Sequence, residues 1–217
     1  MRIVVTAGPT REPIDPVRFI SNRSSGKMGY AIAEAALDAG HDVTLISGPV
    51  AIVSPAKARL VKIATSDELY NAVHDHVRDC DVLIMCAAVS DYKPVRVASQ
   101  KLEKHIEEFS LRLIPTRDIL FSLGHENRSY LVVGFAAETH DLDESAQQKL
   151  LRKNCDLMVA NDVSSRDSGM ESDDNEVTIF SRNDEPKQIA RAPKKIIARE
   201  ILKIVFEMRE KSLTKKT

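Results

Sequence analysis

Short apolar runs rich in β-branched residues alternate with segments of helical spacing along most of this chain. Such runs occupy residues 3–6, 43–46, 60–63, 82–85, 131–133 and 157–159. Helical spacing lies between them, at residues 26–39, 67–77, 117–123 and 144–153. Near-continuous apolar strands are typical of a parallel sheet that is covered on both faces. We therefore predict an α/β fold with a doubly wound, mainly parallel sheet.

Two segments interrupt this alternation. Residues 90–112 form a polar connection longer than most loops, and such connections are usually lids, binding loops or disordered segments. Residues 160–191 combine a polar loop with two short β-like runs, at 177–180 and 188–190. They predict a loop and a β-hairpin appended to the sheet.

The helix boundaries carry their own signals. Thr65 with Glu68 three residues later predicts a capping box at the start of a helix. Pro193 predicts the start of a last helix, and one face of that helix is apolar, with Ile197, Ile201, Ile204 and Met208. We expect residues 212–217 to be a flexible tail, and residues 1–217 to form a single domain.

Composition narrows the class of protein. The chain of 217 residues has 32 acidic and 31 basic residues, so its charge gives no support to nucleic-acid binding. Its three cysteines, Cys80, Cys86 and Cys155, show no CxxC spacing and are expected to be buried, reduced thiols. The apolar start of MRIVVTAGPT is too short for a signal peptide or a membrane span, so we expect a cytoplasmic protein with no membrane partner.

Three predicted strands end in small residues that would leave the backbone open to a ligand. Gly8 follows the first strand, Ala87 and Ala88 follow the fourth with Asp91 just beyond, and Phe135 follows the fifth in GFAAET. In doubly wound sheets, ligands bind beyond the carboxyl ends of the strands. Ordinary turns would account for Gly8 equally well, and a turn or capping role would account for Asp91.

The stretch NRSSGKMG, residues 22–29, places Ser24, Ser25 and Gly26 at the start of a predicted helix. Free backbone N–H groups and the helix dipole favour an anion there, and Lys27 adds a cation. Helix capping by serine is the alternative. The stretch is neither a GxxxxGK[ST] loop nor a GxGxxG loop.

Lysines surround the same predicted edge of the sheet. Lys101 belongs to a basic cluster in the long connection, and Lys149 and Lys153 share one face of a predicted helix. Each cluster alone is consistent with a solvated surface. Together with the strand ends they predict a phosphate or nucleotide site. The six histidines share no spacing and are assigned no role.

Four motifs together carry a family resemblance: TAGPTREPIDPVRFISNRSSGKMG, AAVSDYKP, GFAAET and NCDLMVANDVS. The chain resembles the bacterial phosphopantothenate-cysteine ligases, in a stand-alone form without the flavin-dependent decarboxylase half. The resemblance implies a Rossmann-like fold with a β-hairpin dimerisation arm, for which residues 161–191 are the candidate. It also implies a homodimer that works beside a separate phosphopantothenoylcysteine decarboxylase.

The resemblance further implies a reaction. Enzymes of this family join 4'-phosphopantothenate to cysteine with CTP and Mg²⁺, without flavin, through an acyl-cytidylate and with release of pyrophosphate. By motif, Asn22 would hold the acyl-cytidylate, Lys101 would offset phosphate charge, and Asn22, Ala87 and Ala88 would bind the substrate. The implied nucleotide-binding set is Gly8, Ser25, Gly26, Ala87, Asp91, Lys101, Asp118, Ile119, Phe135, Lys149 and Lys153.

Two departures from the family pattern stand out. The motif Lys-Ile-Lys-Lys reads Lys101-Leu102-Glu103-Lys104 here, so the second lysine is an acid. Asn-Pro-Asp-Ile reads Thr116-Arg117-Asp118-Ile119, so only its last two residues match.

Two rival functions stay open. A nicotinamide-dependent reductase would need a glycine-rich turn after the first strand, which TAGPTREP lacks. A non-catalytic nucleotide-binding module would bind CTP but release no pyrophosphate.

Overall fold

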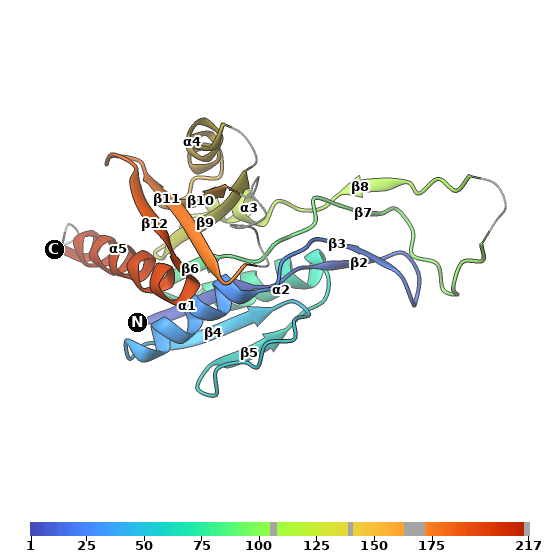
Figure 1. The fold of residues 1–217 in the computed structure, drawn as a ribbon, viewed down its shortest axis with the longest axis horizontal. Coiled ribbons are helices and arrows are strands. Elements are labelled where there is room, and N and C mark those ends of the chain that lie inside the picture. The colour runs from blue at the N-terminus through green and yellow to red at the C-terminus, as the bar shows by residue number, and fades with distance from the viewer. Residues whose placement is uncertain (105–107, 139–140, 163–171, 215–217) are drawn as a thin grey trace.

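A twisted eight-stranded sheet forms the centre of the protein (Figure 1). The computed structural model describes residues 1–104, 108–138, 141–162 and 172–214. The strand order is β12-β11-β10-β9-β6-β1-β4-β5. These strands are β1 (Arg2–Ala7), β4 (Asp42–Ser47), β5 (Arg59–Lys62), β6 (Val82–Met85), β9 (Leu131–Glu138), β10 (Leu157–Asp162), β11 (Asp174–Ser181) and β12 (Lys187–Pro193).

Six neighbouring strands of the sheet are parallel to one another: β10, β9, β6, β1, β4 and β5. β11 runs antiparallel to its neighbours β10 and β12. In the centre, Val4 of β1 lies beside Thr44 of β4 on one side and Leu83 of β6 on the other. The predicted mainly parallel, doubly wound α/β sheet is therefore confirmed. The six strands predicted between residues 3 and 159 are all present, with boundaries shifted by a few residues.

Side chains alternate between two apolar cores because successive strand residues point to opposite faces. Ile3 and Val5 of β1 pack in one core, and Val4 packs in the other. The first core lies under α1 (Lys27–Asp38) and α5 (Lys194–Thr214). The second lies under α2 (Ser66–Val77), α3 (Ile119–Gly124) and α4 (Leu142–Arg152).

Local sequence explains the helix starts. Thr65 accepts a hydrogen bond from the N–H of Glu68, and the Glu68 carboxylate accepts one from the Thr65 N–H, which is the predicted capping box. The last helix begins one residue after Pro193, and Ile197 and Ile201 on its apolar face are buried. A flexible tail was predicted for residues 212–217. The helix continues to Thr214, and residues 215–217 lie outside the described residues.

The long connection contains strands that the sequence did not reveal. β7 (Tyr92–Pro94) pairs with β8 (Leu113–Pro115), and this ribbon runs beside a second one made of β2 (Arg11–Pro13) and β3 (Phe19–Ser21). We call residues 11–21 and 92–115 the arm. It projects from one end of the sheet (Figure 1). Residues 105–107 within it lie outside the described residues.

The predicted hairpin is present but is placed differently from a free arm. β11 pairs with β10 and with β12, so the hairpin completes one edge of the main sheet. Of the loop before it, residues 163–171 lie outside the described residues. The element that projects from the body of the molecule is therefore the arm at residues 11–21 and 92–115.

Candidate active site

The loops that follow β1 and β6 are joined to each other by backbone hydrogen bonds. The N–H of Ala88 donates to the carbonyl of Gly8 at 2.9 Å, and the N–H of Thr10 donates to the carbonyl of Ala88 at 3.1 Å. The buried Thr6 hydroxyl accepts a hydrogen bond from the Ala87 N–H at 3.0 Å. Two of the predicted strand ends thus form one rigid edge, as parallel neighbours should.

Helix α1 begins beside this edge. Gly26 precedes the helix with a φ of 80°, and within the described structure no side chain caps the helix there. The first helical bond runs from Tyr30 N–H to the Gly26 carbonyl, so the N–H groups of residues 27–29 have no acceptor inside the helix. The Ser24 hydroxyl accepts from Gly26 N–H at 3.3 Å, outside the helix. Anion binding at this helix start stays a prediction beside serine capping.

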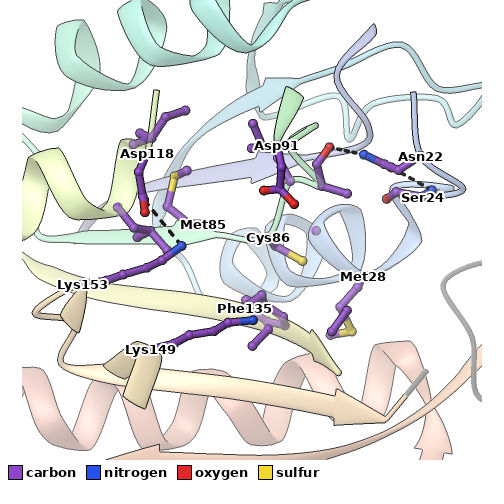
Figure 2. A pocket seen from close by; sticks show the side chains of 18 of the residues that line it. Asn22, Ser24, Met28, Met85, Cys86, Asp91, Asp118, Phe135, Lys149 and Lys153 are labelled. Atoms are coloured by element: carbon purple, nitrogen blue, oxygen red, sulfur yellow. Dashed lines mark hydrogen bonds and ion pairs between the residues drawn. The ribbon is translucent and has the colours of Figure 1, made fainter. Parts of the chain in front are cut away.

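Asn22 bridges the helix entrance and the β6 loop. Its Nδ2 donates to the carbonyl of Ala88 at 2.6 Å, and its Oδ1 accepts from the N–H of Ser24 at 3.1 Å. Both contacts are visible in Figure 2. The side chain is therefore fixed from two sides at the mouth of the site.

A cavity of about 820 Å³ lies along this edge of the sheet. Figure 2 shows Asn22 and Ser24 at one end of it and Lys153 with Asp118 at the other, with Asp91 between. The cavity brings together ten predicted site residues: Asn22, Gly26, Ala87, Ala88, Asp91, Asp118, Ile119, Phe135, Lys149 and Lys153.

The end formed by β9, α3 and α4 carries carboxylate–lysine pairs. Lys149 lies 2.5 Å from the Glu138 carboxylate, and Lys153 lies 3.5 Å from the Asp118 carboxylate. Asp118 also caps α3, because its Oδ1 accepts from the Phe121 N–H at 3.1 Å. Phe135 lies within β9, since this strand continues to Glu138 beyond the predicted end. This end offers an aromatic face together with several polar groups.

Three predicted site residues lie outside the described lining of the cavity: Gly8, Ser25 and Lys101. Gly8 supports the site from behind, because a Cβ on Gly26 would lie 3.4 Å from the Gly8 Cα. Ser24 lines the cavity in place of Ser25. Lys101 is exposed on the arm, next to Leu102, whose carbonyl accepts from Arg18 at 2.7 Å.

The cavity also contains residues that the sequence did not single out. Cys86 directly precedes the two alanines, Asn161 is the next-to-last residue of β10, Asn175 belongs to β11, and Lys194 begins α5. Asn161 stood within the recognised motif NCDLMVANDVS, and Lys194 directly follows the predicted helix-starting proline. Apart from Cys86, no spacing in the sequence links these residues to the others, because distant elements bring them together.

All three cysteines are free thiols, as predicted. Burial raises the pKa of Cys86, which lines the cavity, to about 12, and does the same for Cys80 and Cys155. A thiol of this kind is neutral near pH 7 and is a poor nucleophile.

Metal ligands and membrane segments were also sought among the described residues. They contain no cluster of three or more His, Cys, Asp or Glu side chains placed to hold a metal ion. None of their helices is both long and apolar enough to cross a membrane.

Comparison with known proteins assigns the chain to one family. Residues 1–208 match the family described as the DNA/pantothenate metabolism flavoprotein C-terminal domain. The coenzyme A biosynthesis bifunctional protein CoaBC of Vibrio vulnificus strain CMCP6 is 45% identical over 205 residues, which are 93% of this chain and 51% of that protein. CoaBC of Escherichia coli K12 is 46% identical over 185 residues, 83% of this chain and 45% of that protein.

A solved structure agrees. The crystal structure of the C-terminal domain of a CoaBC protein superposes with a TM-score of 0.83 at 42% identity, covering 97% of this chain and 96% of that one. The chain spans about half the length of the curated relatives that it matches. On these matches and on its architecture, the chain belongs to the family of the DNA/pantothenate metabolism flavoprotein C-terminal domain.

Proposed function

We propose that this chain joins 4'-phosphopantothenate to L-cysteine at the cavity beyond β1, β6 and β9, in coenzyme A biosynthesis. The observation that carries the proposal is the convergence of the Asn22 amide, the N-terminus of α1, and Lys149 and Lys153 at the end of α4 on one cavity. The relatives named for coenzyme A biosynthesis support the choice of pathway.

The proposed reaction has two steps. A carboxylate oxygen of phosphopantothenate attacks the α-phosphorus of CTP, the bond to the β-phosphate breaks, and pyrophosphate leaves. The amine of cysteine then attacks the acyl carbon, the bond to the nucleotide oxygen breaks, CMP leaves and the amine loses its proton to solvent. Activation is needed because a carboxylate is a poor acyl donor, whereas the acyl-nucleotide is a good one.

The residues suit electrostatic catalysis and positioning. N–H groups of α1 and nearby lysines stabilise charge that develops on phosphoryl oxygens. The backbone at Ala87 and Ala88 offers a surface without bulky side chains, and Asn22 holds the acyl group beside it. Phe135, Lys149 and Lys153 line the cavity and would hold the nucleoside there.

CTP and Mg²⁺ are part of the proposal. Mg²⁺ in nucleotide sites keeps several waters and takes one or two carboxylates together with phosphate oxygens. Asp91 and Asp118 line the cavity and can supply such carboxylates, which fits a nucleotide-borne ion better than a cage of protein ligands. The ion would neutralise phosphate charge during activation.

We also propose a homodimer that forms through the arm. Among the described residues, a group of large apolar side chains is exposed along it: Val17, Phe19, Tyr92, Val95, Val97, Phe109, Leu113 and Ile114. A patch of this kind marks an interaction surface. Since the arm carries Lys101 away from the cavity lining, we propose that Lys101 acts in the cavity of the partner subunit.

The cytoplasmic location and a decarboxylase that acts on the product stay predictions. The relatives are named as bifunctional proteins of coenzyme A biosynthesis, which fits a second activity in the same pathway.

The test is an assay for pyrophosphate with phosphopantothenate, cysteine and each nucleoside triphosphate in turn. Pyrophosphate with CTP, followed by CMP and amide product when cysteine is added, is the expected result. Binding of CTP without pyrophosphate would instead support a non-catalytic module. Oxidation of a nicotinamide cofactor without pyrophosphate would support a reductase.

A further inference from the structure

The chain leaves the body of the molecule for the arm at residues 90–93 and returns at residues 115–118. We call these two segments the arm base, and most of their residues line the cavity. The segments are held together, because the Thr116 N–H donates to the Asp91 carbonyl at 2.9 Å and the Thr116 hydroxyl donates to the Ser90 carbonyl at 2.7 Å. One wall of the cavity therefore moves with the arm base.

One carboxylate at the start of α2 contacts both segments of the arm base. The Oδ2 of Asp67 accepts a hydrogen bond from the ammonium of Lys93, and its Oδ1 lies 3.2 Å from the guanidinium of Arg117. Lys93 belongs to the outgoing segment, and Arg117 belongs to the returning one. Asp67 therefore ties both segments to the body of the molecule.

Tyr70, one turn further along α2, holds the same guanidinium from another side. The Cζ of Arg117 lies 4.3 Å from the centroid of the Tyr70 ring. A guanidinium over an aromatic face is attracted by the electrons of the ring. Arg117 lines the cavity, whereas neither Tyr70 nor Asp67 belongs to its described lining. Two residues of α2 thus orient a cation that a ligand in the cavity would meet.

The carboxylate of Asp67 is ionised at neutral pH. The hydrogen bond from Lys93 lowers the pKa of Asp67, burial opposes this, and the charges of Lys93 and Arg117 lower the pKa further. The side chains of Lys93 and Asp67 are 25% and 39% exposed, so solvent screens this pair only in part. Two cations share one carboxylate, and its removal would leave them to repel each other across the arm base.

We propose that Asp67 is a positioning residue for the nucleotide end of the cavity. Through its two cations it holds the arm base against α2, and so places Arg117 and Asp118 beside the nucleotide. This assignment rests on the proposed function, because it assumes that CTP lies at the Asp118 end. Asn22, at the other end, is held by separate contacts, so loss of Asp67 should weaken nucleotide binding and spare 4'-phosphopantothenate.

Two measurements on the whole chain test this assignment. In calorimetric titration with CTP and Mg²⁺, we expect Asp67→Asn to bind CTP about tenfold more weakly than wild type, the loss expected for one misplaced charge-assisted hydrogen bond. In steady-state kinetics, the KM for CTP should rise by a similar factor, while the KM for 4'-phosphopantothenate stays within about twofold. Asp67→Glu keeps the charge and should recover most of the CTP affinity.

A double-mutant cycle tests whether Asp67 acts through Arg117. Arg117→Gln should weaken CTP binding by itself, and Asp67→Asn should add little to that loss. Asp75→Asn is the matched control, since Asp75 is an exposed acid on the same helix, and it should leave CTP binding unchanged. If Asp67→Asn does not fold, Tyr70→Leu is the second variant, and it should show the same selective loss.

Unchanged CTP affinity in folded Asp67→Asn or Tyr70→Leu would overturn the assignment, and so would simply additive losses in the cycle. Equal losses for CTP and 4'-phosphopantothenate would also overturn it, because the defect would then be a general loosening of the cavity. A wild type that binds no CTP would overturn it too. A wild type that releases no pyrophosphate, but whose CTP binding depends on Asp67, would refute the proposed function and support the positioning role.

Discussion

The side-chain amide of Asn22 donates a hydrogen bond to the backbone carbonyl of Ala88, with 2.6 Å between nitrogen and oxygen. The contact joins the entrance of α1 to the loop after β6, so the two halves of the cavity mouth are held at a fixed separation. The Oδ1 of the same side chain accepts from Ser24. An amide is needed here, because one end must donate and the other must accept.

Asn22→Asp replaces the donor by a second oxygen that faces the Ala88 carbonyl. We expect pyrophosphate release to persist, and amide formation to fall about a hundredfold, as for the loss of one positioned donor. Acyl-cytidylate should accumulate and be seen by mass spectrometry. The exposed Asn127→Asp is the control with the same change of charge. Loss of both steps in folded Asn22→Asp would contradict the role given to Asn22.

Lys101→Gln should abolish pyrophosphate release, since it removes a cation that we place in the partner's cavity. Mixed dimers with Asn22→Asp chains should restore amide formation, because one cavity of each hybrid then has both an intact Asn22 and a partner Lys101. A random equal mixture should reach about a quarter of wild-type activity for a twofold dimer. Hybrids without restored activity would show that Lys101 acts in its own chain, and sedimentation would establish the dimer itself.

Gly26→Ala should destabilise the protein more than Gly40→Ala. Both glycines have a φ near 80°, but a Cβ at Gly26 would lie 2.8 Å from Val50 Cγ1, whereas Gly40 has nothing within 4 Å. The left-handed backbone conformation alone should lower the free energy of unfolding of either alanine variant by about 1 to 2 kcal/mol. At residue 26, crowding should lower it by about a further 1 to 3 kcal/mol. Urea unfolding measures both free energies. Val50→Ala should lower the free energy of unfolding less in the Gly26→Ala variant than in wild type. If the losses from the two substitutions simply add, the predicted contact between the new Cβ and Val50 is contradicted.

Asp15, in the turn between β2 and β3, ties the two ribbons of the arm together. Its carboxylate accepts from Arg18 Nε at 2.9 Å and from the N–H of Leu102 at 3.2 Å, which links the two ribbons. Burial would raise the pKa of Asp15, but the hydrogen bonds from Arg18, Val17 and Leu102 outweigh it and hold the pKa well below the ordinary value.

A carboxylate with a lowered pKa stabilises the folded state above its unfolded pKa, near 4, and this contribution is lost as the pH falls toward the folded pKa. We expect the arm to loosen below about pH 4. Asp15→Asn should loosen it at pH 7. Trypsin cleavage after Lys101 and Lys104 should then be faster than in wild type, and the exposed Asp184→Asn serves as the control. Equal cleavage rates would show that other contacts hold the arm.

The sequence predicted well what depends on local chemistry. The capping box at Thr65 and Glu68 forms because its partners are three residues apart. The apolar runs became strands because continuous burial leaves them few alternatives. Residues at strand ends, such as Ala88 and Asp91, reached the cavity because parallel strands present their carboxyl ends at one edge of the sheet.

The tertiary structure decided what depends on distant elements. Lys194 reaches the cavity because α5 packs beside α1, and Asn175 reaches it because β11 joins the sheet next to β10. Lys101 lies on an arm that forms by pairing β7 with β8, although its motif had placed it at the nucleotide. Sequence by itself thus determined the sheet and the helix termini, since their signals lie within a few residues. Which side chains share the cavity was set by packing and strand order, which bring together groups up to 172 residues apart, in the pair Asn22 and Lys194 (194 minus 22).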